Sequence, residues 1–280
     1  MGLGWASRSS ENFIPAMKRL GFSRDVLASA GLLAREGQGG GLFWGRVMFP
    51  IKNARGQAIG FGGRHIVDVK EGAPKYLNTP ETEIFRKREA LYGIDVALPA
   101  ASRLGQMIVV EGYLDRIAMS RHGYHNTIAA QGSSIDFSTI RRLMPIATEK
   151  IILFDGDRAG QIAHDRIVDA ALVDAAPDSA TRFAKLGGGH DPDSFLLENG
   201  RAEMDTLLGA AIPLEEALWQ RTTRRVGRDG GPEARSAIVE ELIRSAETIA
   251  HAETREWFHT VLADRVDREF GPRRRLQDLL

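Results

Sequence analysis

The fold is decided by a stretch at residues 151–160, which reads Ile-Ile-Leu-Phe-Asp-Gly-Asp-Arg-Ala-Gly. Its four consecutive apolar residues are typical of a strand in a parallel sheet, where helices cover both faces. Asp155 and Asp157 follow this strand and flank a glycine, so both carboxylates can point to the same side of the loop. A helical pattern then runs over 159–173. The stretch therefore predicts a buried strand, an acidic turn and a helix.

A second acidic turn of the same kind lies upstream. An apolar run at 107–110 precedes Glu111, and a helical pattern covers 114–122. Further strands are predicted at 127–130, 150–154 and 181–186, with helices at 137–144 and 159–173. This βαβ series predicts an α/β fold, or α+β with the flanking segments included, around a parallel sheet. Ligands of such sheets bind beyond the carboxyl ends of the strands, where Glu111, Asp155 and Asp157 are expected to lie.

The predicted acidic cluster indicates a divalent cation. Like charges that lie close together normally need a cation between them. Oxygen ligands without histidine or cysteine favour Mg²⁺ or Mn²⁺ over zinc, and such ions activate the attacking oxygen and stabilise the leaving oxygen in phosphoryl transfer. Acidic residues after strands are also common as helix caps or solvated loop charges. One acid at one strand end, together with a spaced pair at another, favours the metal site.

A third acidic element, His-Asp-Pro-Asp, occupies residues 190–193. Asp191 is predicted to cap a helix that Pro192 opens. Asp193 is predicted to reinforce the acidic cluster.

The two flanks of the acidic region have their own patterns. Residues 10–34 predict two short helices, the second with Ser23 as its N-cap. The runs 46–52 and 57–63 predict a β-hairpin, in which Pro50 favours the sheet edge, and the stretch 69–88 is predicted to be a polar loop. After the acidic region, long amphipathic helices are predicted at 233–250 and 253–270. The predicted organisation is an N-terminal mixed α/β basic subdomain over 1–104, a parallel-sheet domain over 105–190 and a helical subdomain over 191–280.

Composition limits the classes of function. Lys+Arg and Asp+Glu both number 37, so the formal net charge is zero, which excludes nucleic-acid binding by overall attraction alone. Basic side chains gather instead at 70–88 and at 273–275. The absence of cysteine excludes a disulfide framework and a cysteine zinc site. No apolar run approaches the roughly 20 residues that span a bilayer, and no signal-like start is present, so a cytoplasmic protein without a membrane partner is expected.

Several motifs resemble those of one known family. The runs Glu-Gly-Tyr-Leu-Asp at 111–115 and Asp-Gly-Asp-Arg-Ala-Gly at 155–160 resemble the Toprim signatures of DnaG-type bacterial primases. Four upstream runs, at 46–51, 60–64, 74–82 and 91–93, resemble the blocks that precede Toprim in these primases, in the same order. Other Toprim proteins, such as topoisomerases, lack those blocks. The resemblance covers roughly residues 1–270 and implies a primase catalytic core with a Toprim domain.

The resemblance implies an activity and the residues that carry it. The expected activity is that of a DNA primase, a DNA-directed RNA polymerase that joins NTPs into a short RNA primer on a single-stranded DNA template during replication. The catalytic metals, Mg²⁺ or Mn²⁺, are expected on Glu111, Asp155 and Asp157, with Asp191 and Asp193 as further ligands. The template and nucleotide track is expected to comprise Arg46, Arg64, Lys75, Tyr76, Asn78 and Lys87. Glu111 is expected to act either as a metal ligand or as a general base.

The chain also departs from the family pattern. Complete primases of this kind begin with a cysteine-bearing zinc-binding domain and end with a helicase-binding domain, and neither pattern is present here. The chain is therefore expected to be a fragment or a shortened homologue that holds no zinc and reaches the replicative helicase only through a missing domain or another protein. Two alternatives stay open: a Toprim nuclease, and a degenerate primase-like module that binds DNA or nucleotides. The upstream blocks argue against the first, and the full set of acids argues against the second.

Overall fold

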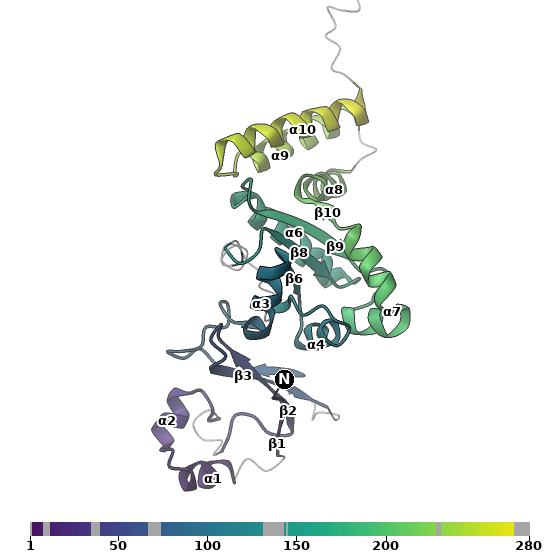
Figure 1. The fold of residues 1–280 in the computed structure, drawn as a ribbon. Coiled ribbons are helices and arrows are strands. Elements are labelled where there is room, and N and C mark those ends of the chain that lie inside the picture. The colour runs from purple at the N-terminus through teal and green to yellow at the C-terminus, as the bar shows by residue number, and fades with distance from the viewer. Residues whose placement is uncertain are drawn as a thin grey trace, which may run out of the picture.

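The computed structural model of the 280-residue chain describes residues 2–7, 12–34, 40–66, 74–130, 143, 145–227 and 231–271. Most of the predicted helix at 137–144 lies outside these residues, as do Lys70 and the basic run at 273–275. Figure 1 shows the N-terminal sheet at one end of the molecule, a larger sheet in the middle and the C-terminal helices at the other end.

The N-terminal part is a four-stranded antiparallel sheet with two short helices. The strands lie in the order β1 (Gly4–Ala6), β2 (Arg46–Lys52), β3 (Ala58–His65) and β4 (Tyr76–Asn78). The helices are α1 (Phe13–Arg19) and α2 (Arg24–Ser29). The Ser23 side chain caps α2 by accepting a hydrogen bond from the Val26 N–H at 3.3 Å. The predicted hairpin and both predicted helices are thus confirmed.

Two details of this sheet differ from the sequence prediction. Pro50 was predicted to lie at the sheet edge, yet β2 lies between β1 and β3. The proline is tolerated there because β1 pairs only with residues 46–48, so β1 does not reach the position of Pro50. The stretch 69–88, predicted to be a loop, contributes the short strand β4. A strand of three residues is too short to show a clear alternation of apolar and polar residues.

The central sheet has six strands in the order β10-β9-β8-β6-β7-β5. Its parallel strands are β6 (Gln106–Val110), β7 (Thr127–Ala130), β8 (Glu149–Phe154) and β9 (Ala180–Lys185). They confirm the predicted parallel sheet. Its edges are two short antiparallel strands, β5 (Leu91–Tyr92) and β10 (Ile212–Pro213). The sheet therefore takes strands from both flanks of the segment 105–190.

Helices cover both faces of the central sheet. The covering helices are α3 (Ile94–Leu104), α4 (Tyr113–Arg121), α6 (Arg158–Val173) and α7 (Pro192–Gly209). Along β6, Met107 and Val109 belong to a core shared with α3 and α6, whereas Ile108 and Val110 belong to a core shared with α4 and α7. Both faces are buried, which explains why β6 and β8 are continuously apolar in sequence. Helix α3 was not predicted, and its internal Pro99 argues against a helix at the sequence level.

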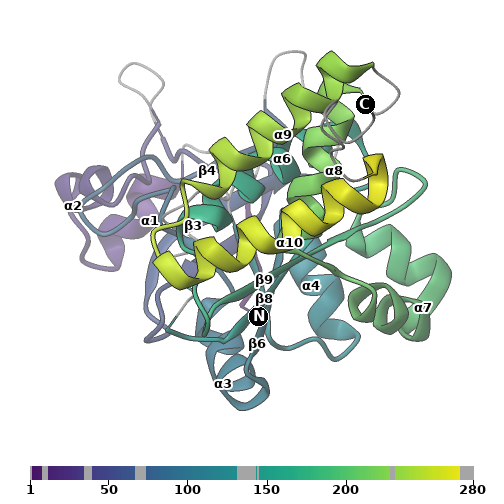
Figure 2. The same ribbon diagram turned by 90° about the horizontal axis from the view of Figure 1, so that it is seen from above.

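Three C-terminal helices pack on the α6 side of the sheet. They are α8 (Leu214–Val226), α9 (Pro232–Ala246) and α10 (Ala252–Phe270), in agreement with the two long amphipathic segments predicted from the sequence. Helices α8 and α9 contact α6, and α10 packs on α8 and α9 (Figure 2). Among the helices of the described ranges, none is long and apolar enough to cross a membrane.

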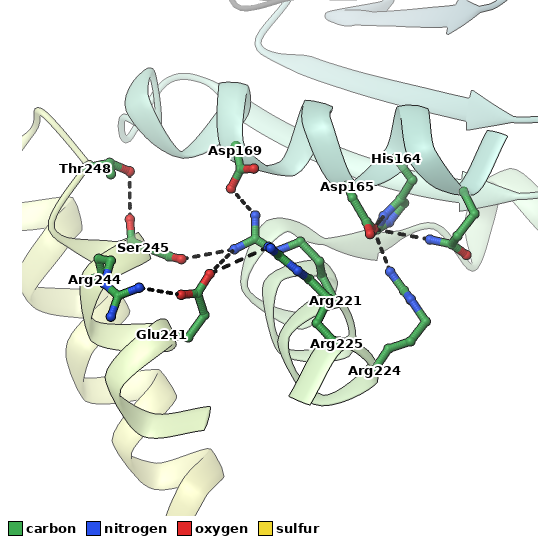
Figure 3. Close-up of polar contacts among 11 residues, drawn as sticks. His164, Asp165, Asp169, Arg221, Arg224, Arg225, Glu241, Arg244, Ser245 and Thr248 are labelled. Carbon is green, nitrogen blue, oxygen red and sulfur yellow. Dashed lines mark hydrogen bonds and ion pairs between the residues drawn. The ribbon is translucent and has the colours of Figure 1, made fainter. Parts of the chain in front are cut away.

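A buried arginine joins α8 and α9 to α6 (Figure 3). The Arg221 side chain on α8 is 1% exposed and forms ion pairs with Asp169 of α6 and Glu241 of α9. Its Nη2 also donates a hydrogen bond to Ser245 Oγ at 3.0 Å. Because α6 begins directly after Asp157, the same helix carries the acidic turn at one end and this network further along.

Candidate functional site

A cavity of about 850 Å³ lies between the N-terminal sheet and the carboxyl ends of β6 and β8. The wall from the N-terminal part is basic and polar and includes Arg64, Lys75, Tyr76, Asn78 and Lys87. The wall from the central sheet and its helices is acidic and includes Glu111, Asp115, Asp155 and Asp191. The structure thus brings most of the predicted site residues to one cavity. Asp157, Asp193 and Arg46 are not part of its lining.

Glu111 and Asp155 follow directly after β6 and β8, which are neighbouring parallel strands. Parallel strands end at the same edge of a sheet, so two carboxylates from distant parts of the chain come together here. Glu111 Oε1 and Asp155 Oδ1 are buried, and neither has a hydrogen-bond partner among the described residues. Buried polar atoms normally have a partner, so these two oxygens suit a ligand that the protein does not itself supply.

The pKa values of both acids are raised, because each carboxylate is buried close to other negative charges. Burial raises the pKa of Glu111, the charge of Asp157 raises it further, and a hydrogen bond from the Asp155 backbone lowers it. Burial raises the pKa of Asp155 to about 8, and the negative charges of Glu111 and Asp115 add to the shift. A divalent cation favours the charged form of a carboxylate and would therefore offset both effects.

The residues present fit a hard divalent cation. The donor atoms at this edge are carboxylate oxygens, which Mg²⁺ and Mn²⁺ prefer. In the part of the chain that the structure describes, no three acidic or histidine side chains are already arranged to hold a metal ion. The site therefore offers two unpaired oxygens with acidic neighbours, and a cation would have to draw the remaining carboxylates inward.

Asp157 and Asp191 both cap helices. Asp157 Oδ1 accepts a hydrogen bond from the Gly160 N–H at 2.7 Å and caps α6. Asp191 Oδ1 accepts one from the Ser194 N–H at 2.7 Å and caps α7, as predicted from the sequence. These bonds engage Oδ1 of each residue. Asp193 is exposed in the first turn of α7.

Asp115 is an acidic residue of the cavity that the sequence analysis did not select. It is 7% exposed, and its Oδ2 accepts a hydrogen bond from the Gly112 N–H at 2.9 Å. Burial, followed by the charge of Asp191, raises its pKa to about 7. A signal was available, because Asp115 follows Gly112 by three positions at the start of a helix, where a carboxylate can accept a hydrogen bond from the N-cap backbone.

The basic wall combines cations with a stacked aromatic ring. The Arg64 guanidinium lies over the Tyr76 ring, 5.5 Å from its centroid. Lys75 and Lys87 are exposed, which leaves their ammonium groups free to meet phosphates.

Arg46 lies outside this wall. It is 3% exposed, and its guanidinium donates hydrogen bonds to the backbone carbonyls of Gly63, Pro74 and Lys75. Its charge therefore stabilises the connection between β3 and β4 and does not face the cavity.

Two parts of the chain match known protein families. Residues 1–98 match the family of the DNA primase catalytic core, N-terminal domain, and residues 105–184 match the Toprim domain. The fold is similar to the crystal structure of a DNA primase domain from Pseudomonas aeruginosa, with a TM-score of 0.85, 32% identity and coverage of 97% of this chain and 84% of that one. The chain belongs to the bacterial DnaG-type primases. The predicted fold class and family resemblance are both confirmed.

Two further primase relatives agree with this assignment. The chain is 38% identical to the DNA primase of Neisseria meningitidis over 201 residues, which are 71% of this chain and 34% of that protein. It also resembles a structure of the DnaG primase catalytic domain bound to ssDNA, with a TM-score of 0.84, 30% identity and coverage of 96% of this chain and 82% of that one. The chain thus spans about a third of the length of the curated primases that it matches.

Most residues of the cavity lie within the two family matches. Toprim primases are typically metal-dependent, in agreement with the unpaired carboxylate oxygens found here. Glu111, Asp155 and Asp157 lie within the Toprim match, whereas Asp191 and Asp193 follow it. The residues of the basic wall lie within the match to the primase catalytic core.

Proposed function

We propose that this primase core synthesises short RNA primers on single-stranded DNA by metal-dependent nucleotidyl transfer. The observation that carries the proposal is a shared cavity, lined on one side by Glu111 and Asp155, each with an unpaired carboxylate oxygen, and on the other by cationic side chains. Cationic side chains hold phosphates, and carboxylates that lack a partner hold a divalent cation. Both are needed for the transfer of a nucleotide to a 3′-hydroxyl.

The acidic wall has the first task. Glu111, Asp155 and Asp157 would hold Mg²⁺ or Mn²⁺, and Asp191 and Asp193 would supply further negative charge. A metal bound there would supply Lewis-acid chemistry, stabilising negative charge on the reacting phosphate and activating the 3′-hydroxyl. Within the protein, Asp155 keeps its carboxylate at the end of β8, and Asp157 fixes the turn through its bond to Gly160.

The basic wall has the second task. Lys75 and Lys87 would hold phosphates of the template and of the incoming NTP, and Tyr76 would offer a ring on which a base can stack. The related DnaG catalytic domain that was solved with ssDNA supports template binding by this fold. Because the net charge of the chain is zero, this local concentration of cations has to provide the attraction. We place the protein in the cytoplasm.

The proposal is tested by incorporation of radiolabelled ribonucleotides on single-stranded DNA with Mg²⁺ or Mn²⁺. We expect the wild-type chain to incorporate label and Asp155→Ala to lose at least about 99% of it, because one catalytic acid commonly contributes a factor of 10² or more. Asp264→Ala is the matched control, since Asp264 is exposed on α10. Equal incorporation by wild type and Asp155→Ala would refute the role of the acidic wall.

The same preparation distinguishes primer synthesis from a Toprim nuclease. Labelled single-stranded DNA is incubated with Mn²⁺ and without nucleotides. We expect the DNA to remain intact, because the segment before the Toprim domain matches the primase core. Cleavage that disappears in Asp155→Ala would replace the polymerase assignment by the nuclease.

A further inference from the structure

Tyr113 connects the two walls of the cavity. It lies two positions after Glu111, at the start of α4, yet its ring reaches into the N-terminal sheet. The side chain is 6% exposed, stacks on Phe49 of β2 with ring centroids 5.3 Å apart, and meets Tyr92 edge-on at 4.8 Å. These contacts hold the ring in one place relative to both sheets.

The N-terminal sheet leaves space for this ring at Gly62 of β3. A Cβ at Gly62 would lie 2.7 Å from the Cε2, Cζ and hydroxyl oxygen atoms of Tyr113, closer than any real contact. Gly62 is also the cross-strand partner of Asn78 in the pairing of β3 with β4. The Tyr113 ring therefore occupies the place that a Gly62 side chain would fill, and its hydroxyl arrives beside Asn78.

The Tyr113 hydroxyl fixes the amide of Asn78. It donates a hydrogen bond to Asn78 Oδ1 at 2.6 Å. An amide oxygen accepts and an amide nitrogen donates, so this bond decides which end of the side chain is engaged. No described residue accepts a hydrogen bond from Asn78 Nδ2, and Asn78 lines the cavity. The Nδ2 group is therefore available as a donor to a ligand in the cavity.

We propose that Tyr113 is a positioning residue for substrate binding: it orients Asn78 so that Nδ2 donates a hydrogen bond to a sugar or phosphate oxygen. The identity of the ligand as a nucleic acid or nucleotide rests on the proposed function. That oxygen acceptor belongs to the template strand or to the incoming NTP. The same hydrogen bond connects β4, which carries Tyr76 and Asn78, to the start of α4, two positions after Glu111.

A double-mutant cycle of Tyr113→Phe and Asn78→Ala tests this role. Tyr113→Phe keeps the ring contacts and removes only the hydroxyl. One arm measures the anisotropy of fluorescein-labelled single-stranded DNA, and the other measures binding of a fluorescent GTP analogue with Mn²⁺. We expect both single variants to weaken the same ligand by about 3- to 10-fold, the usual effect of one hydrogen bond. The double variant should bind no more weakly than Asn78→Ala, because both changes remove one interaction.

Two more variants sharpen the test. Asn78→Asp keeps an acceptor for the Tyr113 hydroxyl but lacks the Nδ2 donor and adds a charge that repels phosphate, so it should bind at least as weakly as Asn78→Ala. Tyr124→Phe is the matched control, because Tyr124 also donates a 2.6 Å hydrogen bond, to Asp205, outside the cavity lining. It should leave both affinities unchanged. In primer synthesis, Tyr113→Phe should raise KM for the affected ligand and leave kcat within about twofold of wild type.

The outcomes separate this inference from the proposed function. Additive losses in the cycle, or wild-type binding by Tyr113→Phe, would overturn the positioning role. So would a drop in Tm of Tyr113→Phe well beyond that of Tyr124→Phe with unchanged binding, since the hydroxyl would then be structural. A wild-type chain that binds ligand but incorporates no nucleotide would overturn primer synthesis, and the double-mutant cycle could still be measured by binding. A wild-type chain that binds neither ligand would overturn both the proposed function and the positioning role.

Discussion

Asp155 is a carboxyl group of the site whose charged form is disfavoured by its surroundings. Burial, and then the charges of Glu111 and Asp115, raise its pKa to about 8. An aspartate in an unfolded chain has a pKa of about 3.9. Between these two values the folded, metal-free protein holds a proton that the unfolded chain releases. The free energy of unfolding should therefore fall as pH rises through this interval, the opposite of an aspartate in a salt bridge.

We expect Asp155→Asn to remove the cost of burying this charge. In EDTA at pH 8 the variant should be more stable than wild type, on the order of 1–2 kcal/mol after allowance for the partial exposure of the group. At pH 4 the difference should vanish, because the wild-type carboxyl is then protonated in the folded state. Millimolar Mn²⁺ at pH 8 should stabilise only the wild type, since the cation binds the charged form.

Thermal melts at several pH values, with and without Mn²⁺, measure these differences, and Asp264→Asn serves as the exposed control. Equal stabilisation of wild type and Asp155→Asn by Mn²⁺ would rule out Asp155 as a ligand.

At the scale of elements, the acidic turn depends on the close approach of α6 to the end of β8. Gly160 lies in the first turn of α6, and its N–H donates the capping hydrogen bond to Asp157. A Cβ at Gly160 would lie 2.4 Å from the carbonyl oxygen of Asp155. A larger residue would therefore push the helix away from the strand and move both carboxylates.

Gly160→Ala should accordingly affect stability and metal binding together. We expect a loss of about 1–3 kcal/mol of stability, the usual cost of an added methyl in a closely packed place. Affinity for Mn²⁺ should fall at least about tenfold, because metal sites tolerate little displacement of their ligands. Calorimetric titration and thermal melts measure both quantities. Gly209→Ala is the control, since a Cβ there meets nothing within 4 Å. If Gly160→Ala bound Mn²⁺ with wild-type affinity, metal binding would not depend on the geometry of this turn.

At the scale of the whole molecule, the C-terminal helices share a core with the central sheet. Trp219 of α8 and Leu242 of α9 belong to the same buried cluster as Phe154 of β8. Arg221 crosses this contact in the buried network of Figure 3. The helix that begins at the acidic turn is thus held at its other end by the C-terminal part of the chain.

Arg221→Ala should destabilise the whole fold. We expect a loss of about 2–3 kcal/mol, below the usual 3–5 kcal/mol for a broken buried ion pair, because Asp169 and Glu241 keep contact with solvent. Arg224→Ala on the same helix is the control: this side chain is 42% exposed and pairs with Asp165, so the loss should stay below about 1 kcal/mol. Urea unfolding measures both. Equally small losses of stability in both variants would show that the Arg221 network does not stabilise the contact between α6 and the C-terminal helices.

The central parallel strands and the acids that follow them were determined by the sequence by itself. The apolar run at 151–154 predicts a strand covered on both faces, and Asp155 must then lie at the sheet edge where parallel strands end. Asp191 is recognisable as a helix cap because Pro192 follows it. These patterns are local, since they depend on residue types at short spacing along the chain.

Only the tertiary structure decided which charged groups face the cavity. Arg46 and Arg64 both occur in runs that resemble primase blocks, yet carbonyls from two distant segments enclose Arg46. The raised pKa of Asp115 likewise requires the starts of α4 and α7 to meet, and the bond between Tyr113 and Asn78 requires the two sheets to meet. Burial, desolvation and hydrogen-bond geometry depend on distances between segments that are far apart in the chain, and a pattern of residue types does not contain those distances.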